Sequence, residues 1–271
     1  MLENSLSALI KGNKVSMQTA LKKLKSIITD AKGIHIDGLS CDMEALDEIF
    51  LFAEKRNASV DHMHGENISK FNFSFQRLGG NITSYNEVKK RSDFILLIGL
   101  NEDSISSDFM KQILNEESNL IKRRDIHFIT EQPKKKSRHS YIKVNKGDLE
   151  KKILKLKDCI INSFDGEKNL NNKDFSLIIK SLNKSRYGTI IFKSQNLSDF
   201  LISEIIDLVK ILSEFKKFNF LHYLGGDNVA GAVQASLWKT GFPLRINFTE
   251  NGPEYNPLEN NSSYLKKKKE L

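Results

Sequence analysis

The chain has 271 residues, of which 39% are hydrophobic and 28% charged, a composition typical of a globular protein with one large or two small domains. Its longest apolar run, residues 94–99, is far shorter than the roughly 18 residues of a membrane span, so we expect no membrane segment. The short apolar patch in residues 1–14 has no basic region before it and no small-residue cleavage site after it, so we expect no signal peptide. Cys41 and Cys159 are the only cysteines, which excludes a disulfide framework and a cysteine metal cluster. We therefore expect a cytoplasmic protein.

The formal net charge is +8, and much of it lies in two short basic segments, residues 134–138 and 266–270. A positive excess indicates an acidic partner. A run of like charges at a chain end is typical of a solvated, disordered tail, so the second segment by itself predicts no partner.

In the first half of the chain, apolar spacing predicts helices and short strands in alternation. A helical stripe of Ala20, Leu21, Leu24, Ile27, Ile28 and Ala31 comes first. Helices are then expected at 43–56, 68–80 and 85–91, and strands at 33–38, 58–63, 93–99, 125–130 and 141–144. Two local signals mark helix ends: Ser84 and Glu87 have capping-box spacing, and Gly79 and Gly80 suit a left-handed cap.

The second half repeats this alternation. Helices are expected at about 149–164, 173–183, 198–214 and 228–238, and strands at 187–192, 218–224 and 244–248. Strands that alternate with helices indicate βαβ units, so we predict an α/β fold with mainly parallel sheets covered by helices.

Three regions are expected along the chain: an α/β half at 1–147, a second α/β half at 148–258 and a lysine-rich flexible tail at 259–271. Residues 164–174 are the best candidate for a linker between the halves.

The stretch SVDHMHGEN, residues 59–67, is the first candidate site. On a strand, His62 and His64 would face the same side, and with Asp61 and Met63 they offer imidazole, carboxylate and thioether groups to copper or zinc. A metal site needs three or four ligands, and spacing indicates no further one. We therefore interpret these residues as polar groups at the carboxyl end of a parallel strand, where ligand crevices open in α/β sheets.

Other motifs give weaker signals. The turns LGGN (78–81) and LGGDNVAG (224–231) match no nucleotide-binding pattern, and Asp227 or Asn228 is expected to cap the following helix. Cys41 precedes a helix but has no base at readable spacing, so we interpret it as a packed thiol. Trp238 is predicted to lie in the core or in an interface.

The segment GGDNVAGAVQASLWKTGFPLRINFTENGPEYNP, residues 225–257, resembles the C-terminal end of the B subunit of formylmethanofuran dehydrogenase. The resemblance rests on an Asn-Val-x-Gly-Ala-x-Gln helix, a Trp-x-Thr-Gly-Phe-Pro turn and a closing Gly-x-Pro-x-Tyr-Asn-Pro motif. It also extends upstream through residues 85–101 and covers the chain from about Ala20 to Pro257.

Catalytic members of that family are molybdopterin oxidoreductases with a tungsten or molybdenum pterin and an iron–sulfur cluster. The resemblance implies cluster-binding cysteines near the amino terminus, but the first forty residues contain none. It also implies a metal-ligating cysteine or selenocysteine at the position of Met63, whose neutral thioether cannot replace an anionic thiolate. We therefore expect no pterin metal, no iron–sulfur cluster, and no catalytic, cofactor-binding or metal-binding residue in this chain.

The chain looks most like the cofactor-free B subunit of the formyltransferase/hydrolase complex of tetrahydromethanopterin-dependent one-carbon oxidation. That resemblance implies three kinds of partner: an amidohydrolase-like hydrolase subunit, a formyltransferase subunit and a C subunit. It implies a structural role in converting formyl-tetrahydromethanopterin to formate through a methanofuran-type carrier. A basic rim at Lys134–Arg138 could steer the glutamate chains of that carrier.

Two alternatives stay open. One is an active tungsten or molybdenum pterin subunit of a formylmethanofuran dehydrogenase, with a nonstandard ligand at Met63 or His64. The other is a basic nucleic-acid-binding protein, which would show strongly salt-dependent binding. No base-reading or stacking motif supports the second, so the favoured interpretation includes neither a nucleic-acid nor a membrane partner.

Overall fold

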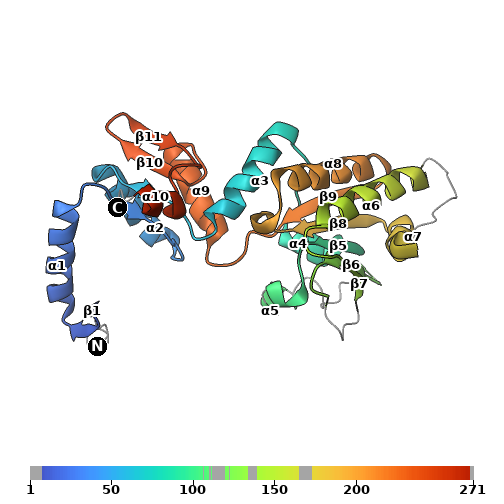
Figure 1. The fold of residues 1–271 in the computed structure, drawn as a ribbon, viewed down its shortest axis with the longest axis horizontal. Helices are drawn as coiled ribbons and strands as arrows, with labels where there is room; N and C mark the ends of the chain where they lie inside the picture. The colour runs from blue at the N-terminus through green and yellow to red at the C-terminus, as the bar shows by residue number, and fades with distance from the viewer. Residues whose placement is uncertain are drawn as a thin grey trace. The chain divides into compact units, whose positions relative to one another are not determined.

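A computed structural model describes residues 8–105, 107–109, 111, 120, 121, 123–133, 139–164 and 173–268. The chain divides into two compact units (Figure 1). Unit 1 joins the two ends of the sequence, residues 1–65 and 227–271, and unit 2 is the continuous segment 66–226. In the part of the chain that the structure describes, no helix is long and apolar enough to cross a membrane.

Unit 2 is built on a five-stranded sheet in which every neighbouring pair of strands is parallel. Its strands are β5 (Phe94–Ile98), β6 (Asp125–Thr130), β7 (Ser140–Lys143), β8 (Tyr187–Phe192) and β9 (Lys217–His222). The spatial order is β7-β6-β5-β8-β9. The chain thus runs outward from β5 in one direction and then returns to continue in the other, which is the doubly wound arrangement.

Helices cover both faces of this sheet, which explains why β5 is apolar along its whole length. Phe94, Leu96 and Ile98 point into one core, and Ile95 and Leu97 point into the other. The first core is closed by α3 (Gly65–Leu78), α6 (Leu149–Phe164), α7 (Ser176–Lys184) and α8 (Asp199–Phe215). The second is closed by α4 (Tyr85–Arg91) and the short α5 (Ser107–Phe109). Single 3-10 turns lie at η1 (Glu102–Ser104), η3 (Lys173–Phe175) and η4 (Ser194–Asn196).

Local sequence signals place several helix ends in unit 2 as expected. The Ser84 hydroxyl accepts a hydrogen bond from the backbone N–H of Glu87 at 3.3 Å, so Ser84 caps α4. At the end of α3, Gly79 has φ +62° and donates its N–H to the Phe75 carbonyl, which is the left-handed ending that the glycine predicted.

Unit 1 contains a smaller mixed sheet in the order β11-β10-β4-β3. Its strands are β3 (His35–Ile36), β4 (Ser59–Val60), β10 (Ile246–Thr249) and β11 (Gly252–Tyr255). The pair β3–β4 is parallel, whereas β10 pairs antiparallel with both β4 and β11. Helices α2 (Met43–Lys55) and α9 (Val229–Thr240) pack against each other, and a last helix, α10, spans Ser262–Lys268.

The amino-terminal part of unit 1 is a separate arm, which we define as residues 8–30. It consists of a two-stranded hairpin, β1 (Ala8–Ile10) and β2 (Asn13–Val15), followed by helix α1 (Met17–Asp30). Lys11 and Gly12 both have positive φ, the geometry of a two-residue type I′ hairpin turn. The Ser16 hydroxyl caps α1 by accepting the N–H of Thr19 at 3.2 Å.

The α/β class and the mainly parallel pairing agree with the sequence prediction; among its described residues unit 2 adds only the short α5 and the 3-10 turns, and the differences in strands lie in unit 1. The strands expected at 33–38 and 58–63 have only two residues each, and β1, β2 and β11 were not expected. Helix α10 occupies most of the segment expected to be a flexible tail.

The expected boundary between residues 147 and 148 falls inside unit 2, between β7 and α6. The division into halves at that point stays a prediction. Most of the expected linker, residues 165–172, and the basic segment 134–138 lie outside the described residues.

Candidate functional site

The first candidate site is the turn Asp61–Gly65, which follows β4 directly and leads into α3. Because β4 pairs parallel with β3, these residues lie at a carboxyl strand end, as expected. The strand belongs to the mixed sheet of unit 1, however, so the turn is not at the switch point of the doubly wound sheet.

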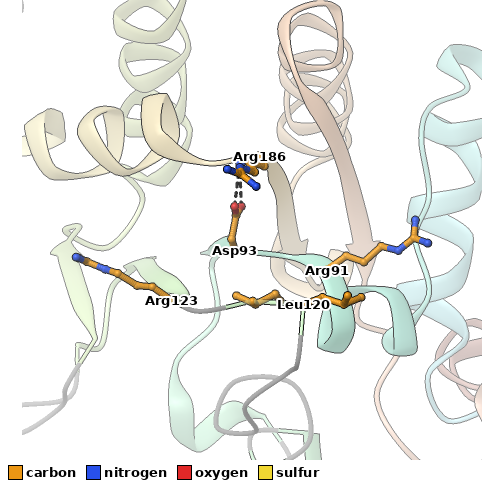
Figure 2. A pocket seen from close by; sticks show the side chains of 6 residues that line it. Arg91, Asp93, Leu120, Arg123 and Arg186 are labelled. Carbon is orange, nitrogen blue, oxygen red and sulfur yellow. Dashed lines mark hydrogen bonds between the residues drawn. The ribbon is translucent and has the colours of Figure 1, made fainter.

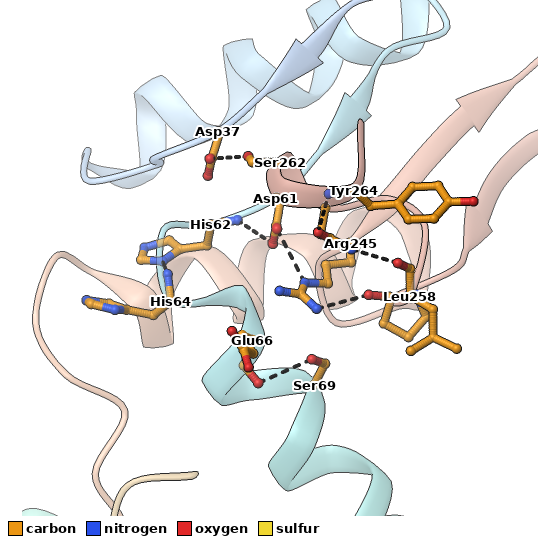
Figure 3. Close-up of polar contacts among 12 residues, drawn as sticks. Asp37, Asp61, His62, His64, Glu66, Ser69, Arg245, Leu258, Ser262 and Tyr264 are labelled. Carbon is orange, nitrogen blue, oxygen red and sulfur yellow. Dashed lines mark hydrogen bonds and ion pairs between the residues drawn. The ribbon is translucent and has the colours of Figure 1, made fainter. Parts of the chain in front are cut away.

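Asp61 anchors this turn through a buried ion pair. Its side chain is only 4% exposed, and Oδ2 lies 3.3 Å from Nε of Arg245 (Figure 3). Its Oδ1 accepts the backbone N–H of His62 at 2.7 Å. Burial raises the pKa of Asp61 to about 6, although Arg245 and the His62 N–H favour the charged form.

Gly65 makes this pair sterically possible. A Cβ atom at residue 65 would lie 2.0 Å from Oδ1 of Asp61 and 3.0 Å from Nε of Arg245. The glycine is thus required by the close approach of the carboxylate and not by an unusual backbone angle. On the other side of the pair, Nη1 of Arg245 donates to the Pro257 carbonyl at 2.9 Å, which ties the turn to the C-terminal motif.

His62 and His64 converge on one residue far along the chain, Asp227. Nε2 of His62 lies 3.0 Å from the Asp227 carbonyl oxygen, and Nδ1 accepts the backbone N–H of His64 at 3.0 Å. This pattern fixes a neutral ring with its proton on Nε2. Burial lowers the pKa of His62, which favours the same neutral form. Nε2 of His64 lies 3.2 Å from the Asp227 carboxylate.

Met63 stands apart from these contacts, with 49% of its surface exposed. Within the described ranges, no group of three or more histidine, cysteine or acidic side chains is arranged to hold a metal ion. The groups beside Met63 are engaged with one another, and the thioether is neutral. The donor set at this turn therefore does not fit a high-valent metal that requires an anionic thiolate.

A second candidate lies at the carboxyl edge of the five-stranded sheet. There Oγ of Ser194 is 2.9 Å from Nε2 of His222, and Oδ1 of Asn67 is 3.1 Å from the same nitrogen. Such a Ser–His pair resembles a nucleophile and its base. Ser194 is completely buried, however, and burial lowers the pKa of His222 to about 3.

The amide of Asn67 completes this network from α3. It accepts the N–H of Ser194 at 2.7 Å and donates to the carbonyls of Tyr223 and Leu224. The three side chains thus bond to one another, and Asn67 also bonds to the backbone at both strand ends, which indicates a structural contact between α3 and the two strand ends and not a reactive centre.

The switch point between β5 and β8, where ligands bind in many doubly wound proteins, is occupied by leucines. Gly99 follows β5 with φ +67°, and a Cβ at this residue would meet Leu197 at 3.2 Å and Leu149 at 3.4 Å. These apolar side chains pack directly on the strand end. They offer nothing polar to a nucleotide or pterin phosphate.

The glycine-rich turn 224–231 also differs from a phosphate-binding loop. Asn228 occupies the position before α9, but it has φ +53° and makes no capping hydrogen bond, contrary to the expectation. Its amide donates to the Cys41 carbonyl at 2.6 Å and fills the space beside Gly231. Burial and the neighbouring Asp42 raise the pKa of the Cys41 thiol, consistent with an unreactive cysteine.

The C-terminal motif is partly packed and partly exposed. The rings of Phe242 and Tyr255 stack with centroids 5.7 Å apart, so the Gly-Phe-Pro and closing segments hold each other. Trp238, in contrast, is 74% exposed. It does not belong to the core, and an interface remains its predicted role.

Three arginines surround a surface hollow of about 400 Å³ at the amino ends of the strands in unit 2. Asp93 lies between them and accepts the backbone N–H groups of Arg186 and Tyr187 at 2.9 and 3.0 Å. Figure 2 shows the side chains of Arg91 and Arg123 pointing away from each other. Because the guanidinium groups do not converge, the hollow is not a formed anion site.

Sequence reasoning missed Arg245 and the partnership of Asp227 with the two histidines. Arg245 is 184 positions from Asp61, and Asp227 is 163 positions from His64. Such contacts leave no periodic signal in the sequence. The positive φ angles of Leu244 and Arg245 are likewise not predicted by the sequence.

Comparison with known proteins finds similar chains among the B subunits of enzyme complexes. No protein-family model matches the chain. The B subunit of the formyltransferase/hydrolase complex Fhc of Methylorubrum extorquens is 21% identical over 252 residues, which is 92% of this chain and 68% of the relative. The B subunit of a tungsten-containing formylmethanofuran dehydrogenase 2 from Methanococcus maripaludis is 23% identical, over 92% of this chain and 61% of the relative. The chain is homologous to both B subunits.

A corresponding dehydrogenase subunit from Methanocaldococcus jannaschii is 36% identical over 64 residues, 24% of this chain and 15% of its own length. The crystal structure of the Methylorubrum extorquens FhcABCD complex with methylofuran contains a chain that matches with a TM-score of 0.81. That match has 20% identity and covers 98% of this chain and 74% of the other. It shows that the B-subunit homologue described here has the same fold.

Proposed function

We propose that this chain is the B subunit of a formyltransferase/hydrolase complex. In that role it binds and positions the catalytic subunits that transfer a formyl group from formyl-tetrahydromethanopterin to a methanofuran-type carrier and release formate. The observation that carries the proposal is homology to the Fhc B subunit over 92% of the chain. Its partners are then a hydrolase subunit, a formyltransferase subunit and a C subunit.

We further propose that the chain works without a pterin metal or an iron–sulfur cluster. Three features of the fold support this. Residue 63 is an exposed methionine, the groups around it are paired with each other, and leucines pack on the switch point of the sheet. An active tungsten or molybdenum subunit would need a thiolate and an open crevice in these places.

Co-expression with the other subunits of the source organism's complex tests the role directly. We expect one assembly that contains this chain and that releases formate from formyl-tetrahydromethanopterin when the carrier is supplied. Omission of this chain should abolish the assembly or its activity. Catalytic subunits that assemble and turn over equally well without the chain would refute the proposal.

Elemental analysis of the same assembly tests the cofactor statement separately. We expect less than one tenth of an equivalent of tungsten, molybdenum or cluster iron per chain. Stoichiometric tungsten or molybdenum would instead support the dehydrogenase alternative. A Met63→Leu substitution, which removes the sulfur and preserves size, should leave formate release unchanged.

The basic segment Lys134–Arg138 is proposed to steer the anionic carrier. Reversal of these charges to glutamate should raise the KM for the carrier and leave kcat unchanged, because steering acts on encounter. An unchanged KM would remove this part of the proposal.

A further inference from the structure

The arm formed by residues 8–30 exposes an apolar stripe that the rest of unit 1 does not cover. Helix α1 has no buried residue, and the first buried residue in the described chain is Leu39. The apolar residues of α1 are exposed: Met17 by 42%, Leu21 by 55%, Leu24 by 50% and Ile27 by 53%. These four residues follow helical spacing and therefore lie on one face.

Neither part of the arm has enough internal structure to be stable by itself. A two-stranded hairpin with no further strand is marginal in water, and so is an isolated helix of 14 residues. The arm is joined to the body of unit 1 near its end, where Nη2 of Arg56 donates to the Ile28 carbonyl at 2.7 Å. An amphipathic helix of this length is normally stabilised by packing of its apolar face.

The charge of the arm indicates the chemistry of the surface that would cover the α1 stripe. Residues 8–30 contain five lysines and one aspartate, a net charge of +4. Lys23 and Lys25 are each one residue from Leu24, which places them about 100° around the helix on either side of the stripe. The complementary surface is therefore an apolar groove with acidic residues along its rims.

Unit 2 of the same chain does not have that character, because its 28 basic and 20 acidic residues give a net charge of +8. A second copy would also bring an identical basic arm and the same overall charge of +8. Like charges oppose pairing of the arm with another arm or with unit 2, whereas the remainder of unit 1 has a net charge of −4, so the cross-link below must distinguish a second copy from another subunit.

We propose that the arm docks its α1 stripe into an acidic-rimmed apolar groove on another subunit of the assembly. This inference rests on the proposed function, since it requires that the chain assembles with other subunits. The inference goes beyond that function in two ways. It assigns one subunit contact to the α1 stripe, and it specifies the partner surface as apolar with acidic rims.

Photo-crosslinking in the co-expressed complex tests the contact. With p-benzoylphenylalanine in place of Leu24, we expect a cross-link to a peptide of another subunit that contains apolar and acidic residues. The same group in place of Ser26, which lies on the opposite face of α1, should give no such product. A cross-link from residue 24 to a second copy, or within the same chain, would overturn the inference.

Substitutions measure the strength of the contact. Leu24→Lys should weaken association with the other subunits at least tenfold, whereas Ser26→Lys, which adds the same charge to the opposite face, should change it less than twofold. Lys23→Glu should weaken it more than Lys22→Glu, and that difference should shrink from 0.05 to about 0.5 M salt as charges are screened.

The outcomes separate this inference from the proposed function. Normal assembly of the Leu24→Lys chain would overturn the inference alone. A wild-type chain that assembles with no other subunit would overturn both. Circular dichroism of the variant chains identifies any loss of assembly that comes from unfolding.

Discussion

The two units differ sharply in the number of hydrophobic side chains that they bury. Of the 49 buried hydrophobic residues in the described chain, 37 belong to unit 2 and 12 to unit 1, and four of those 12 are alanines. Unit 2 also places helices on both faces of its sheet, whereas unit 1 leaves α1 uncovered. Unit 2 can thus be stabilised by its own core, while unit 1 has fewer buried side chains and an apolar helix face that the described chain leaves exposed.

The largest expected effect tests the core of unit 2. Phe192 is completely buried among aromatic rings, so Phe192→Ala should lower the free energy of unfolding by about 3–5 kcal/mol. Phe200→Ala, at a residue 51% exposed in the same unit, should change it by less than about 0.5 kcal/mol. Urea unfolding of the full chain measures both. Equal losses would contradict the assignment of this core.

The next effect concerns pH and unit 1. Because the folded-state pKa of Asp61 is raised from 3.8 to about 6, its protonation stabilises the fold. That stability is fully present below the unfolded pKa and is lost as the pH rises through about 6. The loss amounts to about 3 kcal/mol. The Asp61→Asn variant should not lose this stability. The difference in unfolding free energy, variant minus wild type, should therefore increase as the pH rises from 4 to 7. If the unfolding free energies of the variant and the wild type change equally with pH, Asp61 does not have this raised pKa.

A smaller effect tests the close approach of the Asp61 carboxylate to Gly65 in unit 1. Gly65→Ala puts a methyl group 2.0 Å from the Asp61 carboxylate oxygen and should lower the unfolding free energy by about 1–3 kcal/mol. Gly226→Ala is the matched control, because no atom lies within 4 Å of its added Cβ. Thermal unfolding compares the two. A neutral Gly65→Ala would mean that Asp61 is not held against this glycine.

The smallest effect at pH 7 concerns His127 in unit 2, where acid should act in the direction opposite to that at Asp61. His127 is buried, neither ring nitrogen has a hydrogen-bond partner among the described residues, and burial lowers its pKa from 6.5 to about 4. Its contribution to stability is present above pH 6.5 and is lost as the pH falls through about 4. His127→Leu should remove this acid sensitivity and add about 1 kcal/mol at pH 7.

Urea unfolding at pH 7 and pH 4.5 checks the His127 prediction. A His127→Leu chain that is less stable than the wild type at pH 7 would indicate that the imidazole has a partner. Together with Asp61→Asn, the variant shows whether the two units respond to acid in opposite directions.

The elements of unit 2 could be predicted because their signals are local. The apolar run of β5 indicated burial on both faces, Ser84 marked the start of α4, and Gly79 marked the end of α3. In unit 1 the signals were weaker. Strands of two residues have too little periodicity to fix their ends, and β11 contains Gly252 and Pro253, which do not favour strands.

The candidate site could be predicted only in part. The sequence pointed to His62, Met63 and His64 as a set and identified the neutral sulfur at residue 63. It could not supply Asp227 or Arg245, because both arrive through the return of the chain into unit 1. Those partners decide the chemistry of the turn, since they engage its imidazole and carboxylate groups.

The sequence by itself determined the α/β class, the parallel pairing of alternating strands and the absence of a thiolate at residue 63, because composition and short-range periodicity carry these properties. The tertiary structure alone decided the strand order β7-β6-β5-β8-β9 and the joining of both chain ends in one unit. It also decided that the stripe of α1 is exposed. A buried and an exposed apolar stripe have the same spacing, and only the surrounding chain determines whether one is covered.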